Sequence, residues 1–337
     1  MLELTVNAKS PAAITAALKR MREMVMTGAV EKDTSFHLVL GPGLYRESIR
    51  YNMSNPLVME SAPGLTASEC VIMADNCEAF HQGRENRSIF FLGPNASSVT
   101  LKNFTVENTH LKSVQEDNTK PDSAEAFVWD NVNGTLKAEG MKFIGRQNTL
   151  FVRGNSWFLN CRVEGDTDIV YGEPDLCFLE DCSVHVRSDN RGDYNGYAVK
   201  SRTAAGKKGF VFSGCEFTGE KRKKSSLYVY RTAGLGQAAT GRNFDNAAFL
   251  NCKVSELFSP EFEWDDDMQL DIYPRGNAES GIREYGTKTL RDNGGEEPAD
   301  TVRRNVKSYT LTDDDYFKMY ASRYLVFDGT PLASRLE

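Results

Sequence analysis

The chain has 337 residues, a net charge of −7, and 40% hydrophobic and 26% charged residues. These proportions are those of an ordinary globular protein, and no stretch approaches the roughly 18 to 20 apolar residues that a membrane helix requires. The acidic balance argues against a general nucleic-acid-binding protein, which usually carries a basic excess. It does not exclude an anionic sugar polymer, because a local basic patch can oppose the net charge. We therefore expect neither nucleic acid nor a membrane as a partner. We also expect a monomer.

The first residues, 1–6, carry neither the basic nor the apolar region of a secretory signal. They predict a cytoplasmic protein if the chain is full length, and a secreted one if an N-terminal segment has been trimmed. The seven cysteines form no CxxC pair and only four histidines are present, so we expect no zinc site. Buried free thiols in a reducing compartment are the simplest interpretation of the cysteines.

One segment, residues 10–27, has the pattern of a helix. Ser10 is suited to cap it and Pro11 to be its first residue, while Gly28 ends the pattern. The apolar residues at helical spacing are Ile14, Leu18, Met21 and Val25. We therefore expect a helix that lays one apolar face on another element.

After this helix, short apolar runs recur between Gly, Asn and Asp residues. Four of the later runs end in a cysteine, at positions 161, 182, 215 and 252, which gives a weak repeat of roughly 20–40 residues, typical of a solenoid. No amphipathic helices separate the runs, which argues against βαβ units.

We predict an all-β protein with a single parallel β-helix domain over residues 1–337. Its coils occupy about 36–286, the helix at 10–27 covers the open first coil, and the tail at 287–337 packs on the outside. A β-sandwich is the competing fold, but most connections lack the tight two-residue turns that it needs.

Two strings carry the chemistry. Residues 145–151 read Gly-Arg-Gln-Asn-Thr-Leu-Phe, and residues 163–172 read Val-Glu-Gly-Asp-Thr-Asp-Ile-Val-Tyr-Gly. Together with Phe-Leu-Asn-Cys-Arg-Val-Glu-Gly at 158–165, they resemble three motifs of the pectin methylesterase family, in the same order: Gly-x-Gln-Asp-Thr-Leu, aromatic-x-x-Cys-x-Ile-Glu-Gly and Asp-Phe-Ile-Phe-Gly. Weaker likenesses extend the resemblance over about 37–286.

The resemblance implies a right-handed parallel β-helix that hydrolyses methyl esters on galacturonate chains, releases methanol and uses no metal or cofactor. Its partners would be pectin or methylated oligogalacturonides. Asp168 matches the family's nucleophile, Gln147 its oxyanion-holding glutamine, and Arg231 the arginine that orients the nucleophile. A carboxylate is a weak nucleophile and needs such positioning and an oxyanion hole. A turn aspartate and an exposed arginine are the alternative interpretations.

Two positions depart from the family pattern. Asn148 stands where the family has its acid–base aspartate, and an amide neither gives nor takes a proton at neutral pH. Glu125 stands where the family has a second glutamine. The two positions lie 23 residues apart, about one coil. We hypothesise that Glu125 supplies the acid–base group and Asn148 an oxyanion donor. The alternative is an inactive site.

A basic run and a pair of tyrosines complete the sequence-based prediction. The basic run at 221–224 could meet uronate carboxylates or be a solvated loop. Tyr171 and Tyr230 flank the predicted site and could stack on sugars or pack in the core.

Other functions stay open. They are a thioesterase or acetylesterase, a non-catalytic pectin-binding β-helix, and a lyase or glycosidase; the string at 147–150 argues against the last pair.

Overall fold

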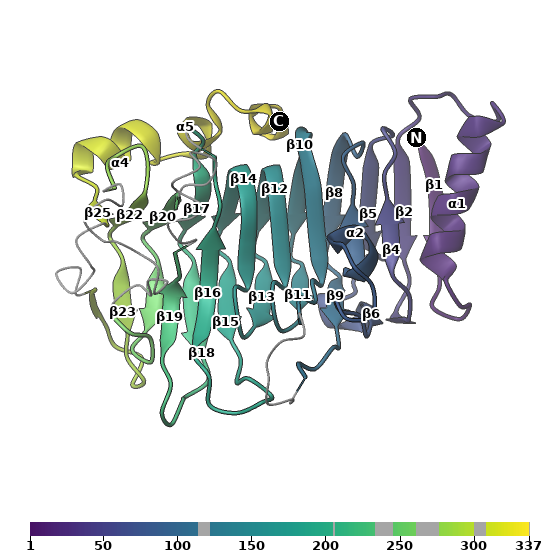
Figure 1. Cartoon of the computed structure of the whole chain (residues 1–337). Coiled ribbons are helices and arrows are strands. Elements are labelled where there is room, and N and C mark those ends of the chain that lie inside the picture. The colour runs from purple at the N-terminus through teal and green to yellow at the C-terminus, as the bar shows by residue number, and fades with distance from the viewer. Residues whose placement is uncertain (114–121, 205, 233–244, 261–275, 300–307, 337) are drawn as a thin grey trace.

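The structure, a computed structural model, describes residues 1–113, 122–204, 206–232, 245–260, 276–299 and 308–336. Its strands stack coil upon coil along one axis, from α1 at the N-terminal end to the C-terminal helices (Figure 1). They form a sheet of 15 strands and a sheet of 10 strands. Neighbouring strands are parallel from coil to coil, apart from one antiparallel pair toward the C-terminal end. This confirms the predicted parallel β-helix and excludes the sandwich. No helix in the described ranges is long and apolar enough to cross a membrane.

The larger sheet contains β1 (Leu2–Val6), β2 (Phe36–Leu40), β4 (Ile49–Tyr51), β5 (Leu57–Ser61), β7 (Phe90–Leu92), β8 (Ser98–Lys102), β10 (Phe127–Glu139), β12 (Leu150–Leu159), β14 (Val170–Glu180), β16 (Gly196–Ser201), β17 (Gly209–Ser213), β19 (Leu227–Tyr230), β20 (Ala247–Leu250), β22 (Ile282–Tyr285) and β25 (Tyr309–Thr310). The smaller sheet contains β3 (Gly43–Tyr45), β6 (Cys70–Ala74), β9 (Thr105–Asn108), β11 (Lys142–Ile144), β13 (Arg162–Gly165), β15 (Ser183–Val186), β18 (Glu216–Gly219), β21 (Lys253–Ser255), β23 (Lys288–Leu290) and β24 (Glu296–Pro298). Within the described residues, the α-helices are α1 (Ala13–Met26), α2 (Arg84–Arg87), α4 (Asp313–Met319) and α5 (Arg323–Phe327), and the 3-10 helices are η1 (Ala67–Glu69) and η3 (Pro331–Arg335).

A repeated turn explains the Asn-Cys, Asp-Cys and Gly-Cys pairs of the sequence. In these four pairs the residue before the cysteine has a left-handed backbone, with φ of 52° at Asn160, 50° at Asp181, 63° at Gly214 and 51° at Asn251. Asn, Asp and Gly are the residues that adopt this conformation at least cost. The residue that follows turns inward and stacks on its neighbours; the Cys161 amide donates to Sγ of Cys182 at 3.3 Å. All seven cysteines are free and buried, which confirms their predicted packing role.

The α1 helix covers the N-terminal end of the coils (Figure 1), where Ile14, Leu18 and Met21 are buried. It begins at Ala13, so the prediction that Ser10 caps it is wrong. The cap comes instead from Glu47, whose carboxylate accepts hydrogen bonds from the backbone amides of Ile14 (3.0 Å) and Thr15 (2.9 Å). An acceptor distant in the sequence thus satisfies the exposed amides of the first turn, and its negative charge suits that helix end.

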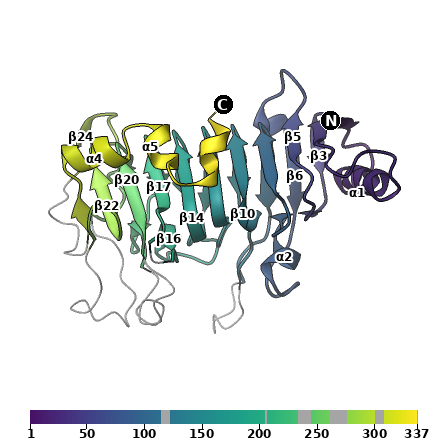
Figure 2. The ribbon, with the colours of Figure 1, turned by 90° about the horizontal axis from the view of Figure 1, so that it is seen from above.

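The C-terminal helices lie along one side of the coils (Figure 2). Phe327 of α5 packs edge-on against Trp157 (5.4 Å between ring centroids) and Phe178 (5.5 Å). Arg335 donates to the carbonyl of Val99 at 2.6 Å. These contacts cover apolar side chains on the outer surface of the larger sheet, so the last residues of the chain contribute to the packing of its central coils.

Candidate active site

The two central motifs meet on neighbouring coils. Gln147 and Thr167 form a parallel β-bridge, and the backbone N–H of Asn148 donates a hydrogen bond to the backbone carbonyl of Thr167 at 3.0 Å. This register places Asn148 and Asp168 at equivalent positions of successive coils. Both have left-handed backbones, with φ of 59° at Asn148 and 49° at Asp168. Since Asn and Asp both tolerate that conformation, exchanging one for the other at position 148 preserves the turn.

Asp168 and Arg231 form a close ion pair. Asp168 is 6% exposed, and its Oδ2 accepts a hydrogen bond from Arg231 Nη2 at 2.5 Å. Its Oδ1 accepts no hydrogen bond from any described residue. The Arg231 guanidinium also lies 4.4 Å from the ring centroid of Tyr197, which holds it against the carboxylate. The arrangement keeps Asp168 oriented and leaves one oxygen uncommitted.

Two glycines of the motifs allow this close stacking. A Cβ on Gly165 would lie 2.6 Å from the Arg146 carbonyl oxygen, and a Cβ on Gly172 would lie 2.0 Å from that of Val152. Gly172 also has a φ of 149°, a conformation that side-chain-bearing residues rarely adopt. These glycines therefore set the spacing of the coils at the site.

Glu125 stacks beside Asn148, as its 23-residue separation predicts. The backbone amides of the flanking Ala124 and Ala126 donate to the carbonyls of Gln147 and Thr149 on the following coil, at 3.2 Å and 2.9 Å. Its side chain, however, is fully buried. Both carboxylate oxygens accept hydrogen bonds from Arg87, from Nε and Nη2, each at 2.6 Å. The acid–base role of Glu125 stays a prediction, and the orientation of its carboxylate toward Arg87 counts against it.

The two predicted sugar-stacking tyrosines lie in different environments. Tyr230 is fully buried, and its hydroxyl donates to Asp245 at 2.7 Å, so its ring has no surface to offer a sugar and acts in packing. Tyr171 stands on the outer face beside Phe151, 5.5 Å between ring centroids. The guanidinium of Arg202 lies 5.3 Å from the Tyr171 ring, and only 6% of this residue is exposed.

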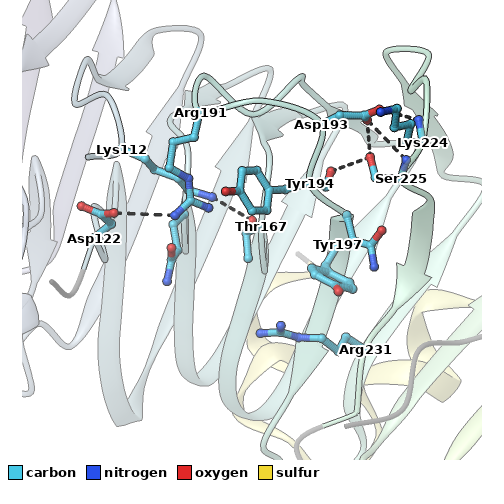
Figure 3. A pocket seen from close by; sticks show the side chains of 12 residues that line it. Lys112, Asp122, Thr167, Arg191, Asp193, Tyr194, Tyr197, Lys224, Ser225 and Arg231 are labelled. Carbon is cyan, nitrogen blue, oxygen red and sulfur yellow. Dashed lines mark hydrogen bonds and ion pairs between the residues drawn. The ribbon is translucent and has the colours of Figure 1, made fainter. Parts of the chain in front are cut away.

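A pocket of about 710 Å³ opens beside Gln147 and Arg231 (Figure 3). Its lining residues are Lys112, Asp122, Gln147, Thr167, Arg191, Asp193, Tyr194, Asn195, Tyr197, Lys224, Ser225 and Arg231. Cationic side chains outnumber carboxylates in this lining, although the chain as a whole is acidic. Of the basic run at 221–224, Lys224 reaches the pocket. The pocket thus brings two of the predicted catalytic residues, Gln147 and Arg231, to the same cavity as Lys224.

Buried charges support the pocket wall. Lys112 is fully buried and forms ion pairs with Asp166 and with Asp189, the latter at 3.2 Å; its Nζ also donates to the Thr167 hydroxyl at 2.8 Å. Burial raises the pKa of Asp166 against the opposing charge of Lys112. Burial also opposes ionisation of Asp189, but hydrogen bonds from Arg191 and the charge of Lys112 outweigh it and lower its pKa to about 2. These ion pairs fix the segment that precedes Asp168.

The sequence predicts only part of the arrangement of residues at this site. Asp168, Gln147 and Arg231 come together as their motifs predict. Tyr197, which holds Arg231, follows no motif but precedes Arg231 by about one coil. Lys112 lies 54 residues before Asp166, and no spacing in the sequence connects them.

The comparison with known families decides the affiliation. The model of the family described as Pectinesterase matches residues 12–282, which is most of the chain and includes every predicted catalytic position. The chain belongs to the pectinesterase family.

Individual pectinesterases are distant relatives. A probable pectinesterase/pectinesterase inhibitor of Arabidopsis thaliana is 26% identical over 173 residues, which cover 49% of this chain and 30% of that protein. A pectinesterase of Daucus carota is 19% identical over 279 residues, covering 81% of this chain and 82% of that protein. The chain spans less than half the length of several of the curated relatives that it matches. A solved pectin methylesterase in complex with a hexasaccharide has a TM-score of 0.70 at 16% identity, and the match covers 98% of both chains. These likenesses establish the right-handed parallel β-helix of the pectinesterase family.

Proposed function

We propose that the chain hydrolyses methyl esters on galacturonate chains and releases methanol. The observation that carries this proposal is the Asp168–Arg231 pair at 2.5 Å. Arg231 lines one pocket together with Gln147, in a chain of the pectinesterase family. The pocket lining includes Lys224, an exposed cation, and a local cation offsets part of the repulsion expected between an acidic protein and an acidic sugar.

The chemistry follows from the positions of three side chains. Oδ1 of Asp168 attacks the ester carbonyl carbon, and the carbon–methoxy bond then breaks to leave an acyl anhydride on Asp168. The Gln147 amide stabilises the oxyanion that forms at the carbonyl oxygen, and Arg231 keeps the carboxylate in line. Methoxide leaves and takes up a proton to become methanol. Water then splits the anhydride, which returns Asp168 and a free galacturonate carboxylate.

Asn148 sets the rate of this sequence. Since its amide cannot give a proton to methoxide, the proton comes from water, and proton transfer by a positioned group contributes about 10²- to 10⁴-fold in enzymes that have one. We therefore propose a slow methylesterase. The same residue favours a second function, a non-catalytic binder of oligogalacturonides, in which the site holds the sugar without cleaving it.

A substrate panel tests the proposal. The chain is incubated with methylated oligogalacturonides, with an acetylated sugar polymer and with an acyl thioester, and the released methanol, acetate or thiol is measured. We expect methanol release alone. Release of acetate or thiol without methanol would assign the site to another ester class, and tight oligogalacturonide binding without any hydrolysis would identify the binding protein.

A further inference from the structure

We infer that Lys112 is a positioning residue for the reaction at Asp168. It holds Thr167, and thereby the backbone that sets Gln147 and Asp168 on neighbouring coils, without contacting the substrate. The inference rests on the proposed function, because it concerns the rate at which Asp168 attacks the ester. Lys112 belongs to the segment that follows β9, 55 residues before Thr167, so this support comes from outside both catalytic motifs.

The ammonium of Lys112 is fully committed to protein groups. Its Nζ donates to the Thr167 hydroxyl at 2.8 Å (Figure 3) and to the Asp189 carboxylate at 3.2 Å, and it forms an ion pair with Asp166. A lysine ammonium has three donors, so each has an acceptor here. Lys112 borders the pocket, but its side chain has no exposed surface. It therefore acts on the site through these neighbours and has no donor left for a ligand.

The backbone of Lys112 is fixed as well. Its N–H donates to the Asn190 side-chain oxygen at 3.0 Å, and the Asn190 side-chain amide donates back to the Lys112 carbonyl at 2.8 Å. These two bonds tie Lys112 to the loop that also carries Asp189. Because both its backbone and its ammonium are held, Lys112 is a rigid support for whatever it contacts.

Thr167 transmits this support to the catalytic residues. It precedes Asp168 in the chain, forms the β-bridge to Gln147, and its carbonyl accepts the backbone N–H of Asn148 at 3.0 Å. Residues 166–169 lie between β13 and β14 and belong to neither strand, so side-chain contacts add to the backbone bonds that hold them. A shift of Thr167 moves the nucleophile relative to the glutamine, and a misplacement of about 1 Å can cost about 10²-fold in rate.

One pair of variants separates positioning from stability. Lys112→Met leaves Asp166 with the weaker pair to Arg146, at 3.9 Å, and should lower the melting temperature. Lys112→Met/Asp166→Asn removes both charges of the pair, while Asp189 keeps Arg191 at 2.9 Å. The double variant should therefore recover most of the melting temperature, although Thr167 still lacks its donor.

Three further variants complete the set. Thr167→Val removes the hydroxyl that Lys112 holds and leaves the ion pairs with Asp166 and Asp189 in place. Asp166→Asn alone keeps the bond between Lys112 and Thr167. Lys207→Met is the matched control, because it removes a lysine from a partly exposed pair with Asp175, at 2.8 Å.

The first measurement is kcat and KM for methanol release from methylated oligogalacturonides, at a temperature where each variant is folded. We expect Lys112→Met/Asp166→Asn and Thr167→Val to lower kcat about 10- to 100-fold with KM unchanged. Asp166→Asn and Lys207→Met should keep kcat within a few-fold. Recovery of kcat together with the melting temperature in the double variant would overturn the inference, and so would a raised KM with unchanged kcat, which would show that these side chains bind the sugar.

The second measurement is amide hydrogen exchange, which needs no turnover. The Asn148 amide donates to the Thr167 carbonyl, and the Gly145 amide donates to the Glu164 carbonyl of the same pair of coils, each at 3.0 Å. We expect faster exchange at Asn148 in the double variant and in Thr167→Val, with Gly145 unchanged. Unchanged exchange at Asn148 in both variants would overturn the inference.

The two measurements also separate this inference from the proposed function. Absence of methanol release by the unaltered chain, with faster exchange at Asn148 in the variants, would overturn the methylesterase function and leave the support of Thr167 by Lys112 standing. Normal methanol release by the unaltered chain, with unchanged kcat in both variants, would overturn the inference alone.

Discussion

Replacing Glu125 distinguishes two roles for this residue, a structural ion pair with Arg87 and the acid–base group of the reaction. Its carboxylate is fully buried and makes two hydrogen bonds of 2.6 Å to Arg87. Removing one partner of a buried ion pair typically costs about 3–5 kcal/mol, because the other charge is left without compensation. Arg87 keeps a second partner in Glu78, so we expect Glu125→Gln to lower the free energy of unfolding by about 2–4 kcal/mol.

Denaturant unfolding measures this loss. The double variant Arg87→Met/Glu125→Gln should be less destabilised than the sum of the single variants, by about 0.5–3 kcal/mol, since it removes both charges of the buried pair and leaves only the partly exposed Glu78 without its partner. As a control, Asp314→Asn removes one partner of an exposed pair in α4, where Asp314 and Lys318 are 74% and 71% exposed. It should cost less than about 0.5 kcal/mol.

Activity of the folded Glu125→Gln variant decides between the roles. A structural ion pair predicts kcat within a few-fold of the unaltered chain, measured under conditions where the variant is fully folded. A 100-fold loss of kcat with unchanged unfolding free energy would refute this reasoning and establish Glu125 as the acid–base group.

Three further predictions concern the site and its support. Asn148→Asp keeps the left-handed turn and should raise kcat for methanol release by about 10²- to 10⁴-fold; an unchanged kcat would show that proton donation is not limiting. Asp189 has a pKa lowered to about 2, so its charge stabilises the fold above about pH 4 and this contribution fades as pH falls toward 2. Asp189→Asn should therefore cost about 2 kcal/mol at pH 6 and progressively less below pH 4, by denaturant unfolding; a pH-independent cost would contradict the ion-pair account. Gly172→Ala should lower the melting temperature sharply, because its Cβ would lie 2.0 Å from the Val152 carbonyl oxygen; an unaffected melting temperature would show that the coils relax freely.

The sequence predicts the features that depend on local repetition. Aromatic runs that end in Asn-Cys or Asp-Cys indicate coils. The left-handed turn favours Asn or Asp, and the inward-facing position that follows it holds the small cysteine side chain. The same locality makes Asp168 and Gln147 recognisable, since their motifs combine the chemistry with the glycines that let the coils approach.

The sequence does not predict side-chain contacts between residues that are far apart in the chain, because no local pattern specifies which partners the fold brings together. Arg87 precedes Glu125 by 38 residues, and any nearby arginine satisfies a carboxylate equally well, so no pattern marks the pair. Glu47 caps α1 across 33 residues, which local capping rules assign to Ser10. Tyr230 is buried because its ring packs in the core, 6.4 Å from the ring centroid of Phe249, and its hydroxyl donates to Asp245; these partners come from later residues of the chain.

The central claim is that this chain is a methylesterase with Asp168 as its nucleophile. The most direct test is the initial rate of methanol release from methylated oligogalacturonides by the unaltered chain and by Asp168→Asn, together with oligogalacturonide binding by both. The account predicts that the variant still binds, with methanol release reduced by at least about 10³-fold, since an amide cannot attack the ester. Equal rates from the two proteins, or no release from either, would contradict it.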